Sequence, residues 1–68
     1  MSIYDVKVRD KPKGQIFTAS GRYRWFAPGR GVQTYARKAR LITVREHIAR
    51  VCAASLGEVR LSRAEKIL

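Results

Sequence analysis

The sequence predicts an α+β fold: a small antiparallel sheet of three to five strands with one helix, at about residues 44–56, packed on one face. Two observations support this class. Short segments that alternate apolar and polar residues are separated by turn-forming residues, and one longer segment has the 3.6-residue apolar period of a helix. A sheet with one apolar face needs a layer to cover it, which the helix can supply. The chain contains no internal repeat or linker, so we expect residues 1–68 to form a single basic domain.

Alternation in the first half of the chain predicts a series of short strands. Tyr4, Val6 and Val8 fall on one face of the first strand, while charged residues fall mainly on the other, which is typical of a half-buried strand. Pro and Gly residues predict turns at 10–14, 20–21 and 27–31. The predicted strands are 3–9, 15–19, 22–26 and 32–35, with 39–42 as a further candidate after a loop or helical turn at 36–38.

The segment 43–57 predicts one amphipathic helix. Thr43 and Glu46 have the spacing of a capping box, and Gly57 is the expected stop. Glu46 and Arg50 are spaced for an ion pair on the solvent side. The predicted apolar face is Val44, Ile48, Val51, Cys52 and Leu56, packed on Val6, Val8, Val59 and Leu61.

The last segment predicts one more strand and a closing turn. Val59 and Leu61 alternate with Arg60 and Ser62, as in a half-buried strand. Ser62 and Glu65 repeat the capping-box spacing, so we expect a helical turn over residues 63–68.

Positive charge is the strongest feature of the composition. Fifteen Lys and Arg residues against five Asp and Glu give a net charge of +10, and ten of the fifteen are Arg. Residues 22–50 alone carry eight positive charges and one negative charge. Arginine suits planar contacts with phosphate or carboxylate, so this balance favours nucleic acid or an acidic protein surface as the partner.

Size and composition argue against an enzyme. A chain of 68 residues buries only about 60% of its unfolded surface, which leaves little stability for a deep active site. Cys52 falls on the apolar face of the helix and His47 beside it, so neither resembles a nucleophile or one of the four ligands of a structural zinc. The five acidic residues flank basic residues or fit capping boxes. We expect no catalytic residues, no metal and no cofactor.

The single cysteine and the absence of a long apolar stretch point to the cytoplasm. One cysteine cannot form an intramolecular disulfide. The longest uncharged stretch has eight residues, and the start MSIYDVKVRD lacks the apolar core of a signal peptide. We therefore expect a cytoplasmic protein that does not bind membranes and has no small-molecule substrate.

The candidate binding site is GRYRWFAPGRG, residues 21–31. In an extended strand Arg22, Arg24 and Phe26 point to one face, and Tyr23 and Trp25 to the other. The aromatic residues on the second face fit either the core or a stacking surface for bases, and the sequence leaves both open for Trp25. The predicted partner-binding residues are Arg22, Arg24, Trp25 and Arg30, extended by Arg37, Lys38 and Arg40 from the segment YARKAR.

The order of elements predicted within residues 15–62 resembles that of small host-interaction proteins of tailed phages. The segments that carry this resemblance are GRYRWFAPGRGVQTYARKARLITVREHIARV and the GEVRL that follows it. The phage proteins are of the anti-CRISPR or host-polymerase-inhibitor type. The resemblance implies a partner in the host cytoplasm, namely a nucleic-acid-processing complex such as a CRISPR surveillance complex or RNA polymerase. Many such inhibitors are acidic, so a basic member would bind an acidic protein surface or compete for nucleic-acid contacts.

The sequence thus predicts a non-enzymatic basic binding module that binds nucleic acid, DNA or RNA, through an Arg-rich hairpin. The alternative is a phage-encoded inhibitor that binds a host complex through protein contacts. A structural or assembly piece of a virion is a third possibility.

Overall fold

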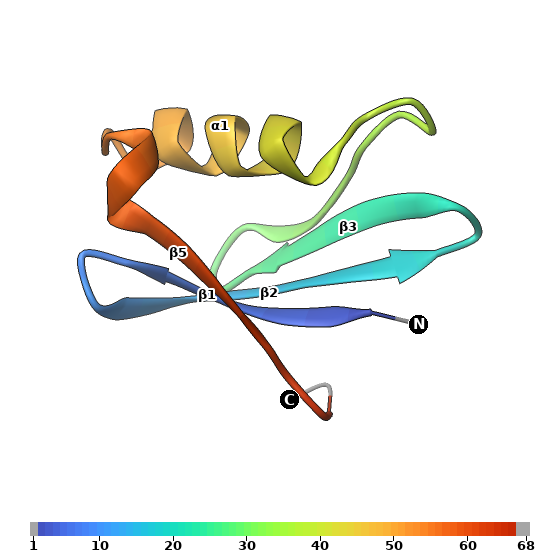
Figure 1. Ribbon diagram of the computed structural model, residues 1–68, viewed down its shortest axis with the longest axis horizontal. Helices are drawn as coiled ribbons and strands as arrows, with labels where there is room; N and C mark the ends of the chain where they lie inside the picture. Colours follow the sequence, from blue (N-terminus) through green and yellow to red (C-terminus); the bar gives the residue numbers. More distant parts are fainter. Residues whose placement is uncertain (1, 67–68) are drawn as a thin grey trace.

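A computed structural model, described here for residues 2–66, contains one five-stranded antiparallel sheet with an α-helix across one face (Figure 1). The order of strands is β4-β3-β2-β1-β5, so the connection through the helix carries the chain from one edge of the sheet to the other. The elements are β1 (Ile3–Val8), β2 (Lys11–Ala19), β3 (Arg22–Ala27), β4 (Gly31–Thr34), α1 (Leu41–Val51), the 3₁₀ helix η1 (Leu56–Glu58) and β5 (Val59–Arg63). The predicted α+β class is confirmed.

The hydrophobic core lies between α1 and the sheet. Val44 and Ile48 of α1 are fully buried, as predicted, and Val51 and Cys52 pack against the core as partly buried residues. The buried apolar residues are Val6, Val8, Ile16, Trp25, Ala27, Val44, Ile48, Ala49 and Val59. No helix in the described part of the chain is long and apolar enough to cross a membrane.

Two tight turns connect the first three strands. Arg9 and Asp10 between β1 and β2 have φ of 53° and 65°, and Ser20 and Gly21 between β2 and β3 have φ of 54° and 73°. Two-residue turns with positive φ at both positions match the twist of antiparallel hairpins. The turn predicted at 20–21 is confirmed, whereas the turn predicted at 10–14 is wrong because β2 already begins at Lys11.

Residues of the wrongly predicted turn form a bulge inside β2. Asp5 is opposite Gln15, but Lys7 is opposite Pro12, so β2 carries one extra residue across from β1. Gly14, with φ of 95°, lies in this bulge. The Pro and Gly that suggested a turn are therefore accommodated in a distorted strand, which is one of the few places where a sheet tolerates them.

The predicted loop at 27–31 is shorter in the structure. Ala27 and Gly31 are already paired, and the amide of Arg30 donates a hydrogen bond to the carbonyl of Ala27 at 3.0 Å. Pro28 and Gly29, the latter with φ of 79°, occupy the two central positions of this turn.

The helix begins three residues earlier than predicted. Arg40 is the N-cap and has no side-chain cap hydrogen bond, and Thr43 is exposed within the first turn. The capping box predicted for Thr43 and Glu46 does not define the start, because Leu41 packs against the core when the helix begins there. The strand considered for 39–42 is also wrong, since Leu41 and Ile42 are helical.

The helix ends at Val51 instead of at residue 56. Ala53 has φ of 51°, the amide of Ala54 donates to the carbonyl of Ala49 at 2.8 Å, and the amide of Ala53 donates to the carbonyl of Arg50 at 3.2 Å. These two bonds form a Schellman motif with Ala where Gly is usual. Gly57 lies in η1 instead, and Leu56 is 37% exposed.

Two further predictions on local structure are wrong. Ser62 and Arg63 belong to β5, Ser62 lies opposite Asp5, and residues 64–66 are not helical, while 67–68 lie outside the described residues. Pairing with β1 therefore overrides the second capping-box pattern. Glu46 and Arg50 make no ion pair, and the ion pair found within residues 2–66 joins Arg9 Nε and Glu58 at 2.8 Å.

Candidate nucleic-acid interface

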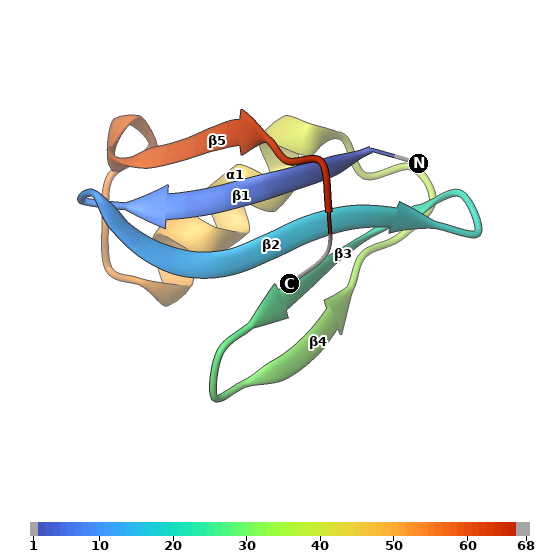
Figure 2. The same ribbon diagram turned by 90° about the horizontal axis from the view of Figure 1, so that it is seen from below.

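The face of the sheet that α1 leaves uncovered carries every second residue of each strand (Figure 2). On this face Arg24 of β3 lies between its cross-strand partners Phe17 and Thr34. The next row places Phe26 between Gln15 and Val32. Directly opposite residues have adjacent side chains, so aromatic and cationic groups alternate across the middle of the sheet.

We call the part of this surface on β3, β4 and the Phe17 end of β2 the hairpin face. Phe26 is 53% exposed and Val32 is 49% exposed, and both are among the most exposed large hydrophobic residues of the described chain. The hairpin face contains no acidic residue. Its members are Phe17, Arg22, Arg24, Phe26, Val32 and Thr34.

Arg24 lies on the hairpin face, and no negatively charged group in the described part of the chain pairs with its guanidinium. Its side chain is half-buried, and its Nε is a buried atom with no hydrogen-bond partner. Neither a carboxylate nor a carbonyl within residues 2–66 pairs with this guanidinium. An anion that reaches the exposed part of this guanidinium would gain a charge-assisted hydrogen bond.

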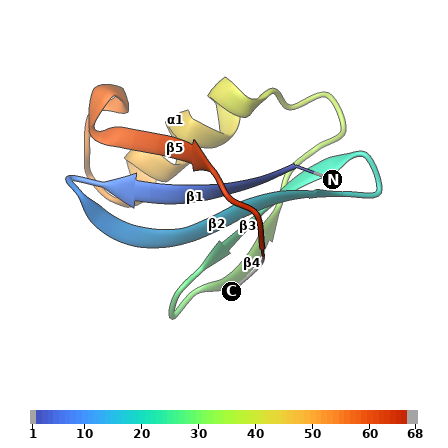
Figure 3. The ribbon, with the colours of Figure 1, turned by 60° about the horizontal axis from the view of Figure 1, so that its bottom comes forward.

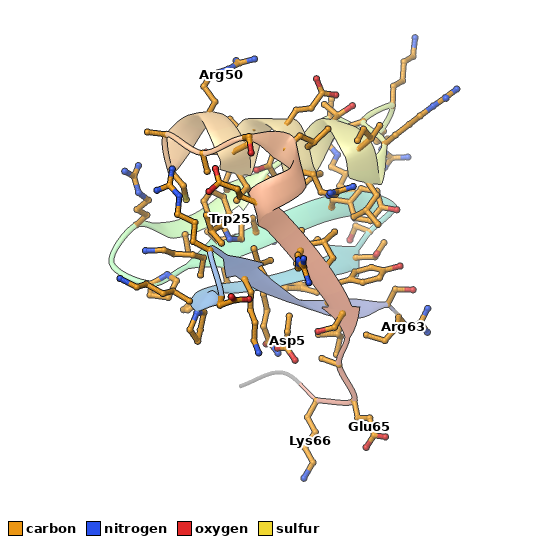
Figure 4. The ribbon with its side chains drawn as sticks, turned by 60° about the vertical axis from the view of Figure 1, so that its left-hand side comes forward. Asp5, Trp25, Arg50, Arg63, Glu65 and Lys66 are labelled. Atoms are coloured by element: carbon orange, nitrogen blue, oxygen red, sulfur yellow. The ribbon has the colours of Figure 1, made fainter. Side chains whose placement is uncertain are left out.

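The other half of the uncovered face, on β1 and β5, is different in character. Gln15 of β2, at the border between the two halves, is buried, and its Nε2 donates to Asp5 of β1 at 2.9 Å and to the carbonyl of Lys66 at 3.1 Å. Figure 3 shows the segment that follows β5 passing across β1 as far as β2, and Figure 4 shows Asp5 below the sheet on the side of Glu65 and Lys66. An acidic side chain and a covering segment make this half a poorer anion-binding surface than the hairpin face.

Trp25 belongs to the core. It is 3% exposed, lies between α1 and the sheet (Figure 4), and donates its indole Nε1 to the carbonyl of Lys13 at 2.9 Å. Its ring meets the His47 ring edge-on, with centroids 6.1 Å apart. The alternative left open by the sequence is therefore decided, and Trp25 is removed from the predicted stacking surface because its indole is enclosed.

His47 is a boundary residue with two structural contacts. Its Nδ1 lies 2.7 Å from the hydroxyl of Tyr35, and their rings also meet edge-on. Burial raises the pKa of Tyr35 to about 12, so its hydroxyl stays protonated at neutral pH. His47 and Tyr35 thus fix the segment that follows β4 to the helix.

The other predicted site residues fall into two groups at opposite ends of the sheet. Arg30 lies in the β3–β4 turn, at the end where the β1–β2 turn also lies (Figure 2). Arg37, Lys38 and Arg40 are exposed in the connection from β4 to α1, at the end of the β2–β3 turn (Figure 1). Of the seven predicted residues, the hairpin face brings together Arg22 and Arg24.

Sequence reasoning assigned Phe26 to the same side as the two arginines but did not include it in the site. The alternation of β3 was sufficient to do so, because a large apolar residue on the polar side of a strand is an informative exception.

Comparison of the chain with protein-family models, with curated proteins and with solved structures finds no match.

Proposed function

We propose that this protein is a non-enzymatic cytoplasmic module that binds single-stranded nucleic acid on the hairpin face. Bases stack on the exposed ring of Phe26, and phosphates contact Arg22 and Arg24. The observation that carries the proposal is the 53% exposed Phe26 two residues from Arg24, whose guanidinium makes no ion pair within residues 2–66. Aromatic rings beside unpaired cations are the usual elements of a single-strand binding surface.

One feature favours a single strand over a duplex. The aromatic residue lies in the middle of a sheet, so a base can stack on it only if its flat face is free, as in unpaired DNA or RNA. The arginines and the absence of an acidic residue on the hairpin face suit the phosphates of either form, so the exposed ring carries the preference.

The direct test is the affinity of a labelled oligothymidylate, measured by fluorescence anisotropy. Phe26→Ala should weaken binding by about 1–3 kcal/mol because a stacked base loses its platform. Arg24→Ala should weaken it by about 1.5–3 kcal/mol because a charge-assisted hydrogen bond to phosphate is lost. Circular dichroism of each variant establishes that the fold is retained.

The chain provides matched controls on the opposite layer. Ile42 is a 42% exposed apolar residue of α1, and Arg50 is an exposed arginine that points away from the sheet (Figure 4). Ile42→Ala and Arg50→Ala should each bind like the parent protein. If Arg50→Ala and Arg24→Ala weakened binding equally, the oligonucleotide would be attracted by the overall positive charge of the protein. That result would contradict the proposed site.

A parent protein that binds no oligonucleotide at near-physiological salt would overturn the proposal. The same face would then serve a protein partner, as the resemblance to phage inhibitors implies. In that case charge reversal at Arg22 and Arg24 should abolish a complex with one stoichiometric protein from nuclease-treated host lysate.

A further inference from the structure

A second basic site lies outside the hairpin face, in a cavity of about 300 Å³ at the end of the domain with the β1–β2 and β3–β4 turns. The cavity opens between the sheet and the C-terminal end of α1. Its apolar walls include Val8, Trp25, Ala27 and Val51. Its volume is at the lower end of the range for small-molecule sites, which is sufficient for a group about the size of one nucleotide.

Four cationic residues and no acidic residue line this cavity: Arg9, Lys11, Lys13 and Arg30. Lys11 lies directly opposite the buried Val8, so its side chain is on the helix side of the sheet. The bulge at Gly14 brings Lys13 to the same end, and the β3–β4 turn supplies Arg30. No ion pair within residues 2–66 involves Lys11, Lys13 or Arg30.

Arg9 has a different role, because it is already paired. Its Nε donates to Glu58 at 2.8 Å, and its Nη2 donates to the carbonyl of Ala53 at 2.9 Å. Arg9 thus engages the Glu58 carboxylate and the carbonyl of Ala53. The charges of Lys11, Lys13 and Arg30 remain available to a ligand.

We propose that this cavity binds a phosphomonoester group attached to a nucleoside, with Lys11, Lys13 and Arg30 as its phosphate ligands. A phosphomonoester carries a charge of about −1.5 to −2 at neutral pH, which matches several unpaired cations better than the single charge of a backbone phosphodiester does. A terminal group can also enter a recess, whereas an internal phosphate must bring the chain in on both sides. The apolar wall accommodates the attached base or sugar. The source is either a free mononucleotide or the phosphorylated end of a strand.

Trp25 provides the readout, because it is the only tryptophan and lines the cavity. Its indole N–H donates to the carbonyl of Lys13, so its single NMR cross-peak reports on this end of the domain. We expect thymidine 5′-monophosphate and inorganic phosphate to shift this peak saturably, and thymidine to leave it unchanged. Arg30→Ala and Lys11→Ala should each raise the dissociation constant for the monophosphate about tenfold, because each removes one charged hydrogen-bond donor.

Arg22→Ala is the matched control, since it removes an arginine from the hairpin face and should leave this titration unchanged. Oligothymidylates with a 5′-phosphate or a 5′-hydroxyl separate the two sources. A shift with the phosphorylated strand indicates a strand end, and a shift with the mononucleotide alone indicates a free nucleotide. Phe26→Ala should retain the mononucleotide shift, so failure of the hairpin-face proposal would be seen separately.

Three results would overturn the proposal. The first is a shift of the indole peak by thymidine that is as large as the shift by its monophosphate. The second is a shift by sodium chloride, at equal ionic strength, that is as large as the shift by phosphate. The third is a titration that is unaffected by both Arg30→Ala and Lys11→Ala.

Discussion

Gly14 lies in the bulge of β2 with φ of 95°, a conformation that side chains with a Cβ rarely adopt. A Cβ added there would also meet the backbone carbonyl of Phe26, which cannot move without breaking the pairing of β2 with β3. The bulge directs the carbonyl of Lys13 to the indole of Trp25, so this glycine links the strand to the core.

We expect Gly14→Ala to lower the free energy of unfolding by at least about 2 kcal/mol, through backbone strain and the clash with the carbonyl. A core of this size contributes only about 3–5 kcal/mol, so the loss should be evident in urea or thermal unfolding. Gly57→Ala is the control, because Gly57 lies in η1 with no atom within 4 Å of an added Cβ. It should change stability by less than about 0.5 kcal/mol. Equal stability of both variants would mean that the bulge is not maintained in solution.

The short helix η1 is held to the β1–β2 turn by Glu58. The carboxylate accepts hydrogen bonds from the backbone amide of Ser55 at 2.9 Å and from its hydroxyl at 3.1 Å, in addition to the bond from Arg9. Arg9 first, and then Ser55, lower the pKa of Glu58 from 4.5 to about 2. One side chain therefore joins the N-cap of η1 to the β1–β2 turn.

This pKa predicts a loss of stability in acid. Below pH 4.5 the unfolded chain takes up a proton at Glu58 while the native protein does not, so the free energy of unfolding falls as pH decreases toward about 2. Glu58→Gln should reduce the dependence of the urea midpoint on pH in this interval. Glu46→Gln is the control, since Glu46 is exposed on α1 and makes no ion pair within residues 2–66. An identical pH profile for Glu58→Gln and the parent protein would contradict the contacts of Glu58.

Local patterns in the sequence predicted which helices and strands form better than they predicted the residues at which those elements begin and end. Alternation identified β1, β3 and β5 correctly, because one face of each is buried and the period of two shows directly in the residue types. The limits of α1 depended on tertiary contacts instead: Leu41 extends the helix at its start, and Ala53 adopts a conformation for which the sequence offered Gly57. Short capping motifs at Thr43 and Ser62 were misleading for the same reason, since packing and strand pairing contribute more than one cap.

For the molecule as a whole, the net charge follows directly from the sequence, but the positions of the charged residues on the folded surface do not. The side occupied by Arg22 and Arg24 followed from the period of β3. The separation of Arg30 from Arg37, Lys38 and Arg40 depended on the order of strands, which places the two connections at opposite ends of the sheet (Figure 1). The basic cavity could not be predicted from the sequence, because Lys11 and Lys13 come from β2 and Arg30 comes from the β3–β4 turn, and these meet only in the folded chain.

This arrangement predicts that the salt dependence of binding grows with the length of the strand. Each phosphate contact to a single strand contributes about −0.7 to the slope of log affinity against log salt. A strand short enough to cover only the hairpin face contacts Arg22 and Arg24, for a slope of about −1.4 by this rule. A strand that continues past Arg22 reaches the end where Arg37, Lys38 and Arg40 lie, and five contacts give about −3.5.

Substitutions at different places in the fold should affect this slope differently. Arg24→Ala should reduce the slope by about 0.7 for strands of both lengths, because the hairpin face is used by both. Arg37→Ala should reduce it for the longer strand only, and Arg50→Ala should change neither slope. Titrations of four- and twenty-nucleotide oligothymidylates between about 50 and 200 mM salt cover the range in which such slopes are measured. Equal slopes for the two lengths would mean that the β4–α1 connection takes no part, and an effect of Arg50→Ala equal to that of Arg24→Ala would mean that the strand has no fixed path on the protein.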